Sequence, residues 1–121
     1  MKTILNKKDL DFDSLIRTIK YPLIILDKEN FIQAANDEAE MFFGISRNIL
    51  NKYKFSSLYP DTSPLFYLIN QSRENGNTIR EYSLNITNPI NQITHEVDIQ
   101  VSPFEESDYL LLIIIERGIA K

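Results

Sequence analysis

Residues 93–101 alternate between apolar and polar side chains without interruption, and this pattern constrains the fold more than any other part of the sequence. A period of two places Ile93, Val97, Ile99 and Val101 on one face of a β-strand, together with His95. The opposite face is polar throughout. The segment therefore predicts a strand with one face against a core and the other toward solvent.

Two further runs, residues 23–26 and 110–115, are apolar at every position. Strands of this composition need cover on both faces, which places them in the middle of a sheet. We expect the two to lie side by side, with residues 31–34 flanking the first and residues 93–101 flanking the second. Short polar segments join neighbouring strands as hairpins. Together with a strand near residues 82–86, these runs predict a five-stranded antiparallel sheet in an α+β fold.

The N-terminal part of the chain predicts an amphipathic helix. Phe12, Leu15, Ile16 and Ile19 have the spacing of one helix face. Pro22 disfavours a helical conformation for the residue before it and so ends the helix. This helix belongs to a flanking segment, residues 1–21.

The residues between the second and third strands predict short helices gathered on one face of the sheet. Asn36 can cap a helix that ends at Gly44, and residues 46–50 form another short piece. Ser63 precedes a proline at the first helical position of a longer helix, which Gly76 ends. The period changes to two after this glycine, where the remaining strands begin.

Composition removes several classes of function. The net charge is −4 and the basic residues form no stripe, so we expect no nucleic-acid partner. The chain has no cysteine, which excludes disulfides, thiolate metal sites and flavin–cysteine photochemistry. The longest apolar run, residues 110–115, is far shorter than the roughly 20 residues of a membrane-spanning helix. We therefore expect a cytoplasmic protein without a membrane partner.

Several segments resemble PAS domains, and within that superfamily the N-terminal sensor domain of nitrogen-regulation (NtrB-type) histidine kinases. The segments that carry this resemblance are residues 22–27 (PLIILD), 35–44 (ANDEAEMFFG), 63–65 (SPL), 77–82 (NTIREY) and 97–103 (VDIQVSP). The resemblance runs from about Leu15 to the end of the chain. It implies a PAS sensor domain at residues 22–117, with residues 118–121 beginning a linker to a further domain.

The resemblance also implies a function. The parent protein would be a cytoplasmic two-component histidine kinase that phosphorylates an NtrC-like response regulator under the control of a PII-type signal protein. The phosphoacceptor histidine and the ATP-binding domain of such kinases lie outside a PAS domain, so this chain would be a sensor without catalytic residues. The alternatives are a ligand-binding PAS domain coupled to another output, such as a transcription activator or a cyclic-nucleotide enzyme, and a small α+β enzyme that uses Asp27 or Glu81.

The residues that could carry other chemistry favour structural roles. His95 precedes a glutamate, as in a phosphoacceptor box, but it lies on a predicted strand, where a packed imidazole hydrogen-bonded to a neighbour is the simpler interpretation. The longest helix has no histidine to bind haem. Asp37, Glu38 and Glu40 suit the start of a helix better than a metal site, because the helix dipole favours anions there. We therefore expect no metal and no cofactor.

The predicted inner face of the sheet is bulky. We expect its aromatic and aliphatic side chains to fill the interior to native density and to leave little room for a ligand. These residues are Phe42, Phe43, Phe55, Phe66, Tyr82 and Leu84.

The other face of the sheet needs its own cover, because the strand at residues 110–115 is apolar on both sides. The predicted interface consists of Phe12, Leu15, Ile16 and Ile19, which could cover this face in their own subunit or across a two-fold axis. We expect a homodimer formed through this helix.

Overall fold

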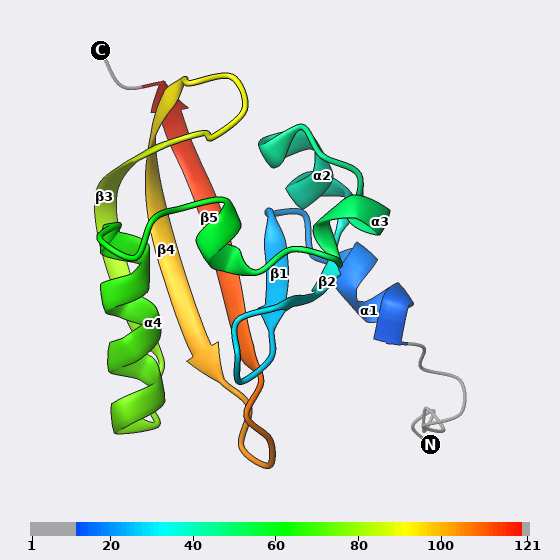
Figure 1. The fold of residues 1–121 in the computed structure, drawn as a ribbon, viewed down its shortest axis with the longest axis vertical. Coiled ribbons are helices and arrows are strands. Elements are labelled where there is room, and N and C mark those ends of the chain that lie inside the picture. Colours follow the sequence, from blue (N-terminus) through cyan, green and yellow to red (C-terminus); the bar gives the residue numbers. More distant parts are fainter. Residues whose placement is uncertain (1–11, 120–121) are drawn as a thin grey trace, which may run out of the picture.

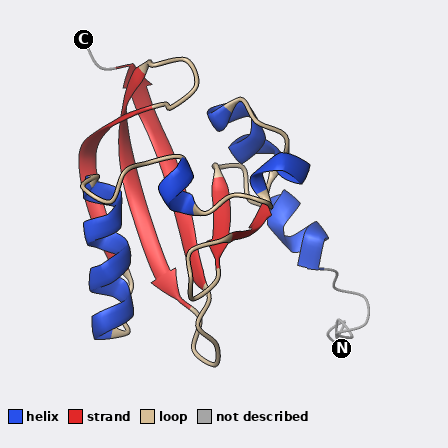
Figure 2. Ribbon diagram, in the orientation of Figure 1, coloured by secondary structure: helices blue, strands red, loops and turns tan. Residues whose placement is uncertain are grey.

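The computed structural model describes residues 12–119 of the chain (Figures 1 and 2). In chain order the elements are α1 (Phe12–Thr18), β1 (Leu23–Leu26), β2 (Ile32–Ala35), α2 (Asp37–Phe43), α3 (Arg47–Leu50), the 3-10 turn η2 (Phe55–Ser57), α4 (Pro64–Asn75), β3 (Ile79–Thr87), β4 (Thr94–Pro103) and β5 (Leu110–Ile119).

The five strands form one antiparallel sheet in the order β2-β1-β5-β4-β3. β1 pairs with β5 from Leu23 opposite Ile113 to Leu26 opposite Leu110, so the two fully apolar runs are neighbours at the centre. The long strands β4 and β5 pair along almost their whole length and form the tall ribbon visible in Figure 1. The predicted strand order and the five-stranded antiparallel sheet of an α+β fold are confirmed, whereas the amphipathic character of the N-terminal helix stays a prediction.

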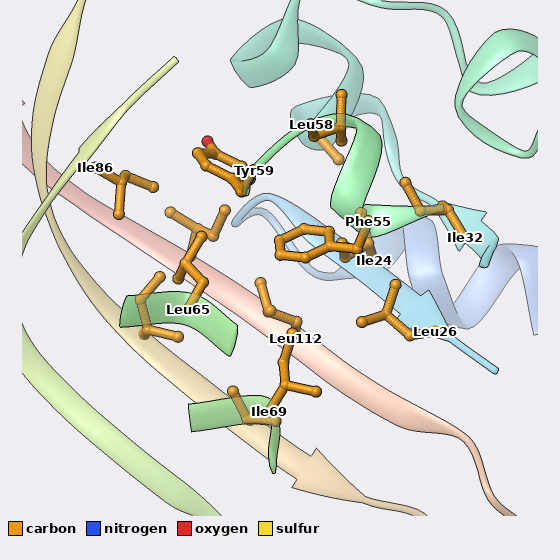
Figure 3. Packing of buried hydrophobic residues seen from close by; sticks show 14 of the residues in the cluster. Ile24, Leu26, Ile32, Phe55, Leu58, Tyr59, Leu65, Ile69, Ile86 and Leu112 are labelled. Carbon is orange, nitrogen blue, oxygen red and sulfur yellow. The ribbon is translucent and has the colours of Figure 1, made fainter. Parts of the chain in front are cut away.

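The helices of the domain body gather on one face of the sheet. α4 packs against β3 and β4, α2 against β1, and α3 against β2. Asn36 caps α2 and Gly44 ends it in a left-handed conformation, as predicted. Ser63 caps α4 and Gly76 ends it in the same way. Between these helices and the sheet lies the main hydrophobic core, part of which Figure 3 shows.

Two strands are longer than the sequence pattern indicated. β3 begins at Ile79, and β5 continues to Ile119 and so includes two residues that we expected in a linker. The division of the chain into a flanking helix, a sensor domain and a linker stays a prediction, and residues 1–11 lie outside the described residues. Of the helices within residues 12–119, none combines the length and the apolar character needed to cross a membrane.

Candidate functional site

Helix α1 lies on the face of the sheet opposite the other helices. Ile16 is buried and packs against Leu23 and Ile25 of β1, whose side chains point away from the main core. Ile19 is half-buried in the same cluster, whereas 51% of Leu15 is exposed. The side chain of Phe12 lies outside the described residues. Of the four predicted interface residues, two therefore contact their own sheet and Leu15 faces solvent.

Beyond α1, the outer face over β3, β4 and β5 carries no helix within the described part of the chain. Ile115 of β5 and Tyr82 of β3 line a shallow depression of about 170 Å³, with Asp98 and Gln100 of β4 between them. Asp98 borders this depression and accepts hydrogen bonds from the side chain of Arg117 and from the backbone N–H of Ser83. The hydrogen bond from Arg117 is the main reason that the pKa of Asp98 lies below its ordinary value. β4, the middle strand of this face, contributes polar side chains, and the apolar Ile115 and Tyr82 lie on either side of it.

Tyr82 was expected in the core, and this prediction is wrong, because 63% of the residue is exposed. The pairing of β3 with β4 shifts by one residue between Glu81 and Leu84. Ser83 is the extra residue and adopts a left-handed φ of 57°. A bulge of this kind reverses the alternation of side chains. Leu84 therefore points toward the core and Tyr82 points away from it.

Asn36 is fully buried and holds more than the start of α2. Its Oδ1 accepts hydrogen bonds from the backbone N–H groups of Ala39 (2.9 Å) and Leu23 (3.0 Å). Its Nδ2 donates to the carbonyl oxygens of Tyr21 (2.7 Å) and Ile19 (3.0 Å). One side chain thus joins the start of α2 to the segment between α1 and β1. The sequence indicated the cap but not the other three bonds.

His95 lies on the inner face of β4, where it packs against helix α2. Its ring centroid is 5.1 Å from that of Phe42, and its Nδ1 pairs with the Oε2 atom of Glu116 on β5. Only 12% of its side chain is exposed. The prediction of a packed imidazole bonded to a neighbour is confirmed, and this strand setting differs from the helical setting of a phosphoacceptor histidine.

Two acidic residues in the first turn of α2 form ion pairs with an arginine. Arg47 of α3 contacts the carboxylates of both Asp37 and Glu40. Glu40 also accepts the backbone N–H of Arg47, and these bonds hold the pKa of Glu40 below its ordinary value. Within residues 12–119, no three His, Asp or Glu side chains gather closely enough to hold a metal ion. These carboxylates tie α2 to α3.

Asp27 shapes the turn between β1 and β2. Its Oδ1 accepts the backbone N–H groups of Glu29 and Phe31, and its Oδ2 accepts the side chain of Gln33. Burial would raise the pKa of Asp27, but these hydrogen bonds and the nearby Arg73 outweigh it and hold the pKa below its ordinary value. A catalytic base would need the opposite shift. Glu81, the other candidate for an enzyme, is exposed on β3.

Arg73 links helix α4 to two turns, a role that the sequence did not reveal. Its Nη2 donates to the carbonyl oxygen of Asp27 (2.6 Å) and to Oδ1 of Asn30 (2.7 Å). Its Nη1 donates to the carbonyl oxygen of Asp108 (2.8 Å), in the turn between β4 and β5. Burial lowers the pKa of Arg73, and the negative charges of Asp108 and Asp27 oppose this shift. The guanidinium thereby fixes α4 to both hairpins.

The interior is filled largely as predicted. Phe43 and Phe55 are completely buried, and Phe42 and Phe66 nearly so. The ring centroids of Phe55 and Phe66 are 5.5 Å apart, and those of Phe42 and Phe43 are 5.2 Å apart. Contacts at these distances occupy the space between the helices and the sheet.

Comparison with curated proteins finds relatives named sensory histidine kinase/phosphatase NtrB, whereas no family model matches the chain. The protein from Rhizobium meliloti (strain 1021) is 33% identical over 108 residues, which cover 88% of this chain and 28% of that protein. The protein from Azospirillum brasilense is 27% identical over 114 residues, which cover 93% of this chain and 28% of the relative. The chain thus spans about 28% of the length of the curated relatives it matches.

Several solved structures with a similar fold are described as PAS domains. The PAS domain of nitrogen regulation protein NR(II) from Vibrio parahaemolyticus has a TM-score of 0.71 at 20% identity and covers 86% of this chain and 95% of that one. A PAS domain from Colwellia psychrerythraea has a TM-score of 0.72 at 14% identity and covers 87% of this chain and 92% of that one. The chain therefore has the PAS-domain fold, and over most of its length its sequence resembles part of the NtrB sensory histidine kinase/phosphatases.

Proposed function

We propose that this chain is the regulatory sensor and dimerisation domain of a two-component nitrogen-regulation histidine kinase, and that it relays a conformational signal to a kinase core outside these residues. The observation that carries the proposal is the 33% identity with NtrB of Rhizobium meliloti across 88% of the chain. In the parent protein the partners would be an NtrC-like response regulator and a PII-type signal protein. The chain itself contributes no catalytic residue.

The arrangement of α1 and β5 supports a relay. Ile16 of α1 belongs to a cluster that includes Leu111 and Ile113 on the outer face of β5. The backbone N–H of Ile114 donates to the carbonyl oxygen of Pro22, which precedes β1. A displacement of α1 would therefore act directly on the central strand β5. Since β5 also pairs with β4 along its length, the movement would reach most of the sheet.

The exposed part of α1 supports the proposed homodimer. Ile16 and Ile19 pack against their own sheet and stabilise the position of the helix. Leu15, on the same helix, remains half exposed. Apolar surface of this kind is commonly covered by a second subunit. We propose that Leu15 and the outer sheet face around Ile115 and Tyr82 pair with the same surface of another copy.

Sedimentation equilibrium of the wild type, Leu15→Asp and Ile49→Asp tests this interface. Ile49 is a matched control, because it is exposed to a similar extent (47%) but lies on α3, among the helices of the opposite face. We expect the wild type and Ile49→Asp to be dimers and Leu15→Asp to be a folded monomer. A wild type that stays monomeric at high concentration, or an equal loss of dimer in both variants, would contradict the interface.

A chimera tests the kinase assignment. The chain would replace the matching region of Rhizobium meliloti NtrB, and the autophosphorylation and phosphatase activities of the chimera would be measured with and without the PII protein of that organism. The control chimera would carry the PAS domain of Bordetella pertussis BvgS, which has a similar fold at 15% identity. We expect PII-dependent regulation only with the present chain. Equal regulation in both chimeras would contradict a nitrogen-specific role.

A further inference from the structure

The C-terminal end of strand β5 is joined to β4 through an irregular piece of the sheet. The register of the two strands shifts between Glu96 and Val97, so that Arg117 has no partner opposite and forms a bulge in β5. Of the described residues beyond this bulge, only 118 and 119 pair with β4. So short a piece of the sheet has few backbone hydrogen bonds of its own. Side-chain contacts near the bulge therefore decide how firmly it stays paired.

Two side-chain pairs flank the bulge, one on each face of the sheet. On the outer face Arg117 donates to Asp98 (2.8 Å), which pairs with the part of β5 before the bulge. On the inner face Glu116 pairs with His95, which lies opposite Ile119, beyond the bulge. The contact between Glu116 and His95 is therefore the one that spans the bulge.

The two pairs differ in how they respond to pH. Arginine keeps its charge, whereas the imidazole of a histidine gains and loses a proton between about pH 5 and 8. His95 is the only histidine of the chain. When protonated, it makes a charge-assisted bond to the carboxylate of Glu116, roughly twice as strong as the bond from a neutral donor. Of the two pairs, only this one can weaken as the pH rises through that range.

The charged side chains that face His95 come from β5 and α2. Glu116 pairs with its ring, and Glu38 borders the same depression as Glu116 and Phe42. Residues 85–93, in β3 opposite His95 and in the loop that follows, are uncharged. The ring packs against Phe42, and only 12% of the side chain is exposed, which keeps the imidazole beside Glu116. Both neighbouring charges are negative and so do not oppose protonation of the ring.

We propose that His95 and Glu116 form a pH-sensitive latch, which fastens residues 116–119 of β5 to β4 when His95 is protonated and loosens them when it is neutral. The sign follows from the charges, because the ion pair is complete below the pH at which His95 titrates and is lost as the pH rises through it. This inference rests on the relay through β5 proposed above. In such a sensor the latch makes signal transfer depend on the pH.

Amide exchange measured by NMR on the 121-residue chain between about pH 5 and 8 tests the latch. The exchange rates of residues 116–119 are divided by those of an unstructured peptide at the same pH, which removes the general acceleration of exchange by base. The ring signal of His95 reports its protonation in the same samples. We expect the protection of residues 116–119 to fall about two- to fivefold as the ring loses its proton, the effect of one partly exposed ion pair. The amide of Ile99, in the middle of β4, should show no such step.

Three variants assign the step to the latch. Glu116→Gln removes the carboxylate and His95→Gln removes the titrating ring, so both should lose the step. Because 42% of the Glu116 side chain is exposed, Glu116→Gln should fold even if His95→Gln folds poorly. Asp98→Asn is the matched control, because it removes the other pair at the same bulge. It should lower the protection at every pH and keep the step.

The latch is overturned if protection shows no step while the His95 ring titrates, if the step survives in Glu116→Gln, or if Asp98→Asn also abolishes it. The sedimentation and chimera experiments are each done at a single fixed pH. Their outcome does not depend on the latch, so failure of the latch is distinguishable from failure of the proposed function.

Discussion

Replacing Asn36 with alanine should destabilise the domain more than any other substitution of a single polar side chain that the structure suggests. The change removes four hydrogen bonds at once. Two of them are accepted from the N–H groups of Leu23 and Ala39, and two are donated to the carbonyl oxygens of Ile19 and Tyr21. The junction between α1, β1 and α2 would lose its common polar contact.

The magnitude follows from where each partner lies. Loss of the helix cap costs about 1 kcal/mol. The N–H of Leu23 belongs to a residue with only 1% exposure, so leaving it without a partner costs about 1–3 kcal/mol. The carbonyl oxygens of Ile19 and Tyr21 lie near the surface and can bind water, so they add little. The sum is about 3 kcal/mol, roughly a hundredfold in the folding equilibrium.

Urea unfolding followed by far-UV circular dichroism measures this loss, since the chain has no tryptophan for fluorescence. The midpoint should fall by about 1–2 M urea. Asn36→Ser can still cap α2 but is too short to reach the other partners, so it should recover only about 1 kcal/mol. Asn70→Ala, at an exposed position of α4, is the control and should change stability by less than about 0.5 kcal/mol. A loss below about 1 kcal/mol for Asn36→Ala, or full recovery with serine, would refute the reasoning.

Three further predictions concern other residues of the site. Arg73→Met should destabilise the domain by about 2 kcal/mol. Arg73→Lys should not restore stability, because an ammonium group cannot reach acceptors in two separate turns. Urea unfolding measures the stability of both variants, and full rescue by lysine would contradict the linking role. Because the pKa of Asp27 is lowered, its carboxylate contributes to stability above the ordinary pKa, and this contribution is lost as the pH falls through the lowered value. Asp27→Asn should therefore flatten the acid limb of the curve of stability against pH. An unchanged acid limb would contradict this role of Asp27. The chain should accept no phosphate from ATP in a label-transfer assay, and labelling that His95→Ala abolishes would overturn its structural role.

Much of the fold was predictable because it depends on patterns local in sequence. The alternation at residues 93–101 and the apolar runs at residues 23–26 and 110–115 determine which strands are central, and the sheet follows from them. Caps such as Asn36 and Gly76 are recognisable, because few residue types suit those backbone positions.

The features that were missed depend on contacts between distant residues or on backbone geometry without a sequence signal. The bulge at Ser83 reverses the side chain of Tyr82, yet a serine with positive φ looks like any other strand residue. Arg73 meets acceptors 43 and 46 positions away in the chain, which no local pattern can indicate. Whether the hydroxyl of Tyr59 finds a hydrogen-bond partner depends on the core around it. The sequence predicts only that the aromatic ring is buried.

The pairing of β1 with β5 also has a consequence for the order in which the chain folds. Leu26 of β1 pairs with Leu110 of β5. β1, which needs cover on both faces, is therefore synthesised early, whereas its neighbour β5 is the last of the five strands to be synthesised. Until residues 110–113 are available, β1 can pair only with β2, and one of its edges stays open. Closing so long a loop is slow, and an open apolar edge favours association with other chains. Nascent or truncated chains that stop before Leu110 should therefore aggregate or require a chaperone, whereas a chain that includes β5 can cover the open edge of β1.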